Sequence, residues 1–156
     1  MGLLTVEVGD LRLEGTEGAL VLAAGLAILS AVKLGSVGGL SGGGLIIASL
    51  LLHELGHLAM AQALGVRVKA IGMCLKGAYL RRQRSPRARN ELLIAASGPL
   101  ANLVLYFWLR DGDLVLQWVA LMNLVLAGSN LIPIPGTDGA RILESVRDLG
   151  GRNQES

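Results

Sequence analysis

Four apolar segments constrain the fold of this chain more than any other feature. They cover residues 19–40, 44–64, 91–109 and 114–134, and each approaches the roughly 20 residues that an α-helix needs to cross a bilayer. The chain of 156 residues is 52% hydrophobic and 17% charged, with a mean hydropathy of +0.56, which is more apolar than a soluble domain of this length. We therefore predict an α-helical, polytopic membrane protein with about four transmembrane helices.

The first apolar segment is the weakest of the four. Lys33 interrupts it, and residues 35–44 are rich in glycine. Two interpretations remain open for this part of the chain. It is either a tilted span, or a shorter helix followed by a loop that dips into the membrane.

Two stretches outside the spans favour β structure. Residues 4–13 alternate between apolar and polar side chains on either side of Gly9-Asp10, which predicts a short N-terminal hairpin outside the membrane. Residues 66–80 suggest a short β element, with Gly72 and Gly77 as turn points.

Basic residues are concentrated between the second and third spans. Residues 65–90 contain no acid and eight basic side chains, which are Arg67, Lys69, Lys76, Arg81, Arg82, Arg84, Arg87 and Arg89. The positive-inside rule places this loop in the cytoplasm, where it can contact anionic lipid headgroups. Aromatic residues beside the short connection 110–113 match the opposite interface. We expect both termini on the cytoplasmic side, in the plasma (inner) membrane of a prokaryote.

Charge and cysteine content exclude some partners and sites. The formal net charge of +2 is too small to indicate a nucleic-acid partner. Cys74 is the only cysteine, so neither an internal disulfide nor a cysteine-rich metal cluster can form. Nothing in the sequence indicates an oligomeric state.

The second span contains the sequence His53-Glu54-Leu55-Gly56-His57. Residues four apart lie on one face of a helix, so the two imidazoles can bind one metal ion. Glu54 lies beside them and can take a proton from water at that metal. An acid at the centre of a span costs about 2.5–3.5 kcal/mol, which favours a metal site over histidines that pack by chance in a helix bundle.

A catalytic zinc site needs a third protein ligand, and Asp138 is the candidate. It follows the fourth span in residues 130–139, where two prolines and two glycines break the helix. The alternative is a solvated turn residue with Arg141 as its partner, because Asp-Gly is common in turns.

Three stretches together resemble the site-2 protease family of intramembrane zinc metalloproteases. They are His53–His57, Ala95–Asn102 and Asn130–Gly139, in the order and spacing of that family. The resemblance covers a catalytic core of residues 44–145 within a single membrane-embedded domain, residues 1–156. The chain departs from the family's pattern at Thr137, where leucine is common, and at Ala140, where a second glycine is common.

The resemblance implies an intramembrane zinc endopeptidase that hydrolyses peptide bonds within or near transmembrane segments of a protein or peptide substrate. One zinc ion is then expected on His53, His57 and Asp138. Glu54 is expected to act as general base and acid, and Asn130 to hold the substrate backbone or to stabilise the tetrahedral intermediate. The β-prone loop at 66–80 would pair with an unwound strand of the substrate.

Other interpretations remain open beside this one. The chain could be a catalytically inactive scaffold of the same fold that binds a membrane partner, although such a scaffold has no need of all four polar residues. A divalent-metal transporter is a further class, although the chain has only one His/Asp cluster. For Asn130 and Asn102 the structural alternative is an interhelical hydrogen bond, and Gly98-Pro99 indicates a kink or a close helix contact rather than chemistry.

Overall fold

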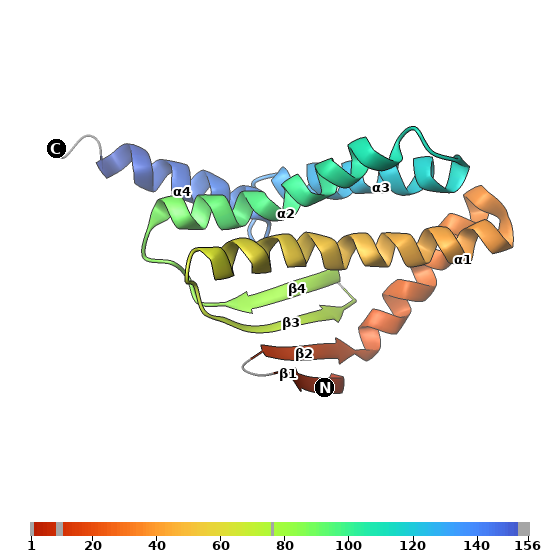
Figure 1. Ribbon diagram of the computed structural model, residues 1–156, viewed down its shortest axis with the longest axis horizontal. Coiled ribbons are helices and arrows are strands. Elements are labelled where there is room, and N and C mark those ends of the chain that lie inside the picture. Colours follow the sequence, from red (N-terminus) through yellow and green to blue (C-terminus); the bar gives the residue numbers. More distant parts are fainter. Residues whose placement is uncertain (1, 9–10, 76, 153–156) are drawn as a thin grey trace.

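The computed structural model describes residues 2–8, 11–75 and 77–152. Its elements are β1 (Gly2–Val8), β2 (Leu11–Thr16), α1 (Glu17–Ala63), β3 (Val68–Cys74), β4 (Gly77–Arg82), α2 (Ala88–Leu109), α3 (Leu114–Leu131) and α4 (Asp138–Arg152). The C-terminal half of α1 lies between the sheet on one side and α2 on the other, and it contacts both (Figure 1).

The helices α1, α2 and α3 are long and apolar enough to cross a membrane. At 47 residues, α1 would extend about 70 Å at 1.5 Å per residue, more than twice the hydrocarbon thickness of about 30 Å. It does not extend that far, because the backbone turns at Gly35, where φ is 75° and ψ is 175°. This left-handed conformation favours glycine. Residues 17–34 and 36–63 thus form two helical arms.

The glycine-rich stretch after the turn is helical and packs against the first arm. A Cβ atom on Gly39 would overlap Ala31, and one on Gly43 would overlap the backbone of Ala27. Small residues allow two helices to approach closely inside a membrane. The interpretation as a loop dipping into the membrane is therefore wrong. The predicted helical fold with about four apolar spans is confirmed. The two arms of α1 account for two of the four segments, and α2 and α3 account for one each.

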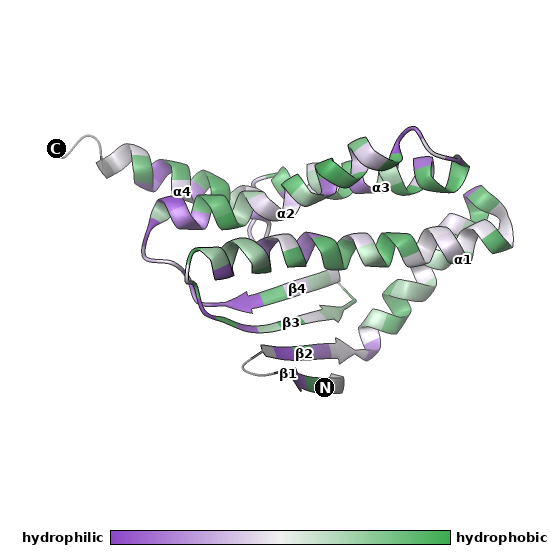
Figure 2. Cartoon of the chain, viewed as in Figure 1, coloured by the Kyte–Doolittle hydropathy of each residue, from purple (hydrophilic) through white to green (hydrophobic). Residues whose placement is uncertain are grey.

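The helices show the inverse of the pattern found in a soluble protein. Large apolar side chains such as Val32, Leu100 and Trp108 are exposed, while Asn102 and Asn123 are fully buried. Figure 2 shows mostly apolar residues along α1 and α3 and over most of α2, hydrophilic residues on β2, at the end of β4 and at the start of α2, and a mixture of both along α4. An apolar exterior around a polar interior is expected for helices whose outer surface faces lipid.

The four strands form a single sheet in the order β1-β2-β3-β4. The pairs β1/β2 and β3/β4 are antiparallel, which confirms both predicted β elements, while β2 and β3 pair in parallel. The turn predicted at Gly9-Asp10 lies outside the described residues. Gly77 begins β4 with φ 122°, but the prediction of a turn at Gly72 is wrong, because Gly72 lies inside β3 opposite Tyr79.

Gly72 instead permits a contact between strands that are not neighbours. The Tyr79 hydroxyl on β4 donates a hydrogen bond of 2.6 Å to the Glu14 carboxylate on β2, and Arg81 also pairs with Glu14. A Cβ atom at Gly72 would overlap the Tyr79 ring. The hydrogen bond stabilises the neutral phenol, which raises the pKa of Tyr79. The N-terminal strands are thereby tied to β4.

A buried ion pair fixes β4 to the start of α2. Two guanidinium nitrogens of Arg82 donate to the two Glu91 carboxylate oxygens, at 2.7 and 2.8 Å. The Ser85 backbone N–H donates to the same carboxylate. Both charged side chains are buried, and such bidentate geometry holds the two elements in one relative position.

Candidate metal centre

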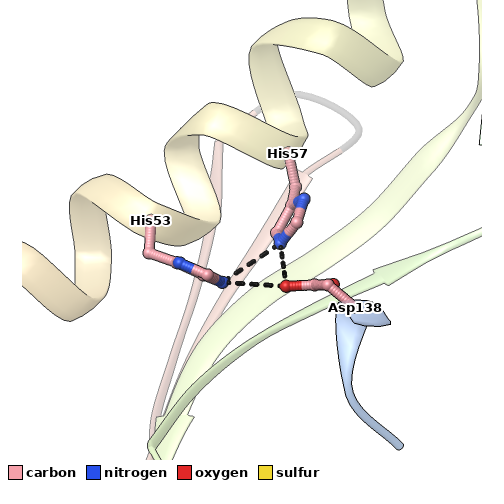
Figure 3. Close-up of side chains that lie close together, drawn as sticks. All are labelled: His53, His57 and Asp138. Carbon is pink, nitrogen blue, oxygen red and sulfur yellow. Dashed lines mark hydrogen bonds and ion pairs between the residues drawn. The ribbon is translucent and has the colours of Figure 1, made fainter. Parts of the chain in front are cut away.

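The structure brings together the three side chains that the sequence singled out as metal ligands. His53 and His57 point from one face of α1 toward Asp138, the first residue of α4 (Figure 3). The Nε2 atoms of the two histidines lie 3.2 Å apart, and the Asp138 Oδ2 atom lies 3.2 Å from His53 Nε2 and 3.1 Å from His57 Nε2. All three residues are buried.

These separations fit a tetrahedral zinc site. Ligands bound at about 2.0–2.1 Å around a tetrahedral zinc ion lie about 3.3 Å from one another. The donor set of two imidazole nitrogens and one carboxylate oxygen is typical of catalytic zinc, which keeps its fourth position free for water or substrate. The described residues thus offer three potential ligands at a spacing that fits zinc.

Both imidazoles are oriented through their other ring nitrogen. His57 Nδ1 donates to the Ile94 carbonyl oxygen at 2.6 Å, and His53 Nδ1 lies 2.5 Å from the Asn102 amide oxygen. A metal-binding histidine commonly donates its second N–H to such an acceptor, which fixes the tautomer and the ring orientation. The interhelical hydrogen bond suggested for Asn102 is present, from its amide nitrogen to Asn123 on α3, but the contact of its oxygen with His53 was not predicted.

The break after α3 places Asp138. The Thr137 hydroxyl lies 2.6 Å from the Ile132 carbonyl oxygen and 2.8 Å from that of Ile134, and it also accepts a hydrogen bond from the Ala140 backbone N–H. Thr137, one of the departures from the family's pattern, therefore caps the first turn of α4. Asp138 is only 7% exposed and faces the histidines, so the alternative of a solvated turn residue does not hold.

The metal centre opens into a polar cavity of about 270 Å³. Glu54 and Asn130 line it together with the three ligands, and residues of β4 form the opposite wall. The Asn130 side-chain nitrogen donates to the Leu126 carbonyl oxygen of its own helix at 2.9 Å, rather than to another helix. Glu54, Asn130 and the metal centre thus share one cavity.

A second hollow of about 540 Å³ adjoins this cavity. The two share Leu80, Arg82 and Arg141 in their walls, and further basic side chains such as Lys69 and Arg84 line the second one. Basic side chains of the loop and of α4 therefore line the hollow next to the metal centre, and Arg141, which the sequence suggested only as a turn partner of Asp138, borders both hollows.

Comparison with known proteins agrees with the geometry. The profile of Peptidase family M50 matches residues 44–110. The chain is 33% identical over 112 residues to a zinc metalloprotease of Methanocaldococcus jannaschii, a match that covers 65% of this chain and 33% of that protein. The solved structure of the site-2 protease from the same organism matches with a TM-score of 0.72 at 26% identity, over 92% of this chain and 70% of that one. The chain belongs to the site-2 protease family.

Membership of the site-2 protease family agrees with the apolar helices, and the chain is an integral membrane protein. Its His-His-Asp cluster is consistent with one bound zinc ion. The chain spans about a third of the length of the curated relative that it matches.

Gly98 is a site residue that the sequence interpretation missed. It lies on α2 directly against the metal centre, where a Cβ atom would overlap the Nε2 atoms of both His53 and His57. The predicted close helix contact is therefore present, but it is made with the two histidines of the candidate zinc site. A Gly-Pro pair in a helix ordinarily indicates only a kink, which is why the sequence gave no sign of this role.

We expect Gly98→Ala to weaken zinc binding at least about 10-fold, the scale of changes to groups that orient metal ligands. The added methyl group displaces the two imidazole nitrogens from their positions. Competition with a chelator of known affinity measures the effect. Gly44→Ala is the matched control, because Gly44 lies on the same helix as the histidines with open space around it. Equal zinc affinity in Gly98→Ala and the wild type would contradict the prediction.

Proposed function

We propose that this chain is the catalytic unit of a zinc-dependent intramembrane endopeptidase, which cuts peptide bonds within or near transmembrane segments of other proteins. The observation that carries the proposal is the shared cavity, in which three zinc ligands and one further carboxylate meet inside a bundle of apolar helices. The proposed unit is a single domain of residues 1–156 with its catalytic core at 44–145.

The proposal assigns His53, His57 and Asp138 as ligands of one zinc ion. When bound, zinc supplies Lewis-acid chemistry, which acidifies water and polarises a carbonyl group. Glu54 is the general base that accepts a proton from the attacking water and the general acid that returns it to the leaving amine. Its carboxylate is half-buried, next to His53 in sequence, and lines the same cavity.

The proposal assigns substrate binding to Asn130 and to strand β4. The Asn130 amide donates to its own helix through nitrogen, which leaves its oxygen free to accept a hydrogen bond from a substrate backbone N–H. The strand β4 is at the edge of the sheet and lines the cavity, so an unwound segment of substrate can add to it as a further strand. A transmembrane helix must unwind to bind in this way, so helix-breaking residues near the cleavage site favour cleavage.

The proposal places the path of water to the site past the basic side chains of the loop and of α4 that line the adjoining hollow. Because basic loops remain in the cytoplasm, the proposal places the active site toward the cytoplasmic side of a prokaryotic inner membrane. Water reaches the buried carboxylate along this route, and the basic residues contact anionic lipid headgroups.

The test is cleavage of a single-span membrane substrate by the purified zinc-loaded protein in detergent. We expect cleavage within or near the span, located by mass spectrometry, to stop after chelation and to return when zinc is added. Cleavage that survives chelation would contradict a zinc mechanism. A protein that binds no zinc and cuts nothing would instead support the inactive scaffold.

A further inference from the structure

A continuous line of buried polar side chains runs from the metal centre through α2 and α3 and back to α1, four residues before His53. It connects His53 and Ser49 on α1, Asn102 on α2 and Asn123 on α3. The links are His53 Nδ1 to Asn102 Oδ1 at 2.5 Å, Asn102 Nδ2 to Asn123 Oδ1 at 2.8 Å, and Asn123 Nδ2 to Ser49 Oγ at 2.9 Å. Both asparagines have no exposed surface, and Ser49 is 3% exposed.

The far end of this line fixes the direction of every hydrogen bond in it. The Asn123 amide faces the Val119 carbonyl oxygen at 2.9 Å, and a carbonyl oxygen can only accept. Ser49 donates its single proton to the Leu45 carbonyl oxygen at 2.9 Å, so toward Asn123 it acts as an acceptor. The Asn123 side-chain nitrogen must therefore face these two acceptors, and its oxygen must face Asn102.

The same reasoning carries the direction on to His53. Because Asn123 presents an oxygen, Asn102 must present its nitrogen to Asn123 and its oxygen to His53. The Nδ1 atom of His53 then carries the proton, and the Nε2 lone pair points toward His57 and Asp138. A reversed Asn102 amide would place a donor against Nδ1 and favour a proton on Nε2, where the metal ligand atom must be free.

We infer that Asn123 is a positioning residue for the zinc site. It touches neither the metal ligands nor the cavity, but it sets the orientation of the Asn102 amide and, through it, the tautomer of His53. This inference rests on the proposed zinc site. Groups that orient a zinc-bound histidine commonly change metal affinity 10- to 100-fold when removed, and here the orienting group acts through one intermediate amide.

The experiment compares Asn123→Leu with Asn123→Asp in the full chain. Leucine is of similar size but leaves the Asn102 amide free to reverse, so we expect zinc affinity to fall about 10-fold or more. At this fully buried position an aspartate side chain is expected to remain an uncharged carboxylic acid. Its O–H group can donate to the Val119 carbonyl oxygen while its other oxygen accepts from Asn102, so the Asn102 nitrogen stays turned toward position 123. We expect Asn123→Asp to remain within about 3-fold of the wild-type zinc affinity. Should Asn123→Leu fail to fold, Asn123→Ala removes the same atoms without adding apolar bulk.

Three readouts separate positioning from simple packing. Zinc affinity is measured by chelator competition, the ligand field by the absorption spectrum after cobalt replaces zinc, and stability by thermal unfolding. Ser30→Ala is the matched control, because buried Ser30 accepts another interhelical hydrogen bond, from half-buried Trp118, and this bond has no link to His53. We expect this control to lower stability and leave zinc affinity and the cobalt spectrum unchanged.

A second substitution provides a rescue. Asn102→Asp in the Asn123→Leu background places an obligate acceptor against His53 Nδ1, so we expect zinc affinity to recover. Loss of affinity to the same extent in Asn123→Leu and Asn123→Asp, or wild-type affinity in both, would overturn the inference while leaving the zinc site intact. A wild-type protein that binds no zinc would instead remove the proposed function on which the inference rests.

Discussion

Glu54→Gln is expected to lower the rate constant of cleavage, kcat, by about 10²- to 10⁴-fold, the usual contribution of general acid–base catalysis. Glutamine has the size and shape of glutamate but cannot accept a proton from water. Glu54 lines the cavity without being one of the three clustered ligands. We therefore expect the variant to bind one zinc ion with wild-type affinity, so that the lost activity reflects the lost proton transfer alone.

Single-turnover cleavage of a membrane substrate, together with zinc analysis of the same sample, measures this effect. Glu144→Gln is the matched control, because Glu144 is an exposed acid in the adjoining hollow, where it pairs with Arg84 at 2.8 Å. We expect the control to retain kcat within about 2-fold, as for most surface substitutions. A Glu54→Gln protein with zinc bound and nearly full activity would show that another group moves the proton.

The cluster of His53, His57 and Asp138 could be predicted from the sequence because local rules place each of its members. Two histidines four residues apart must share a helix face, and α1 presents both to one centre. Asp138 follows two prolines that end α3, and a break of this kind inside a membrane protein requires a buried or wet environment. The resemblance then joined residues that are 81 positions apart, which periodicity alone cannot do.

The supporting residues could not be predicted, because their roles depend on which helices meet. In the sequence, an asparagine in a span has the same appearance whether it joins two helices or orients a metal ligand. Only the contact with His53 in the structure indicates the second role for Asn102. Gly98 differs from any helix-packing glycine only through its position against two imidazoles. Strand β2 precedes α1 in the sequence and β3 follows it, yet the two strands pair in parallel. Neither strand carries a local sequence signal for this pairing.

The turn at Gly35 illustrates the same limit at the level of the fold. A glycine-rich stretch in an apolar segment is compatible with a loop or with a tightly packed helix, because both need small residues. The first arm decides between a loop and a helix. Its residues Ala27 and Ala31 form a surface against which Gly43 and Gly39 pack as a helix. These contacts join residues on two different helical arms. A prediction made from the glycine-rich segment alone therefore cannot include them.

Asp138→Ala is expected to weaken zinc binding by roughly 10²- to 10⁴-fold and to reduce cleavage below detection at physiological zinc. Zinc sites of peptides bind with about 10–16 kcal/mol, so losing one of three protein ligands removes about 3–5 kcal/mol, or two to four powers of ten. The two histidines remain 3.2 Å apart at their Nε2 atoms, but two ligands do not close a catalytic site.

Zinc content after dialysis and competition with a chelator measure the loss in Asp138→Ala, and thermal unfolding confirms that the variant is folded. Asp148→Ala is the control, because Asp148 is an exposed acid on the same helix, α4, and its zinc affinity should equal that of the wild type. Asp138→Glu moves the ligand oxygen by about one methylene, so we expect an intermediate affinity, because zinc tolerates only small departures from its ligand distances. If Asp138→Ala still binds one zinc ion as tightly as the wild type, the third ligand must come from another residue, and the break after α3 serves the fold rather than the metal.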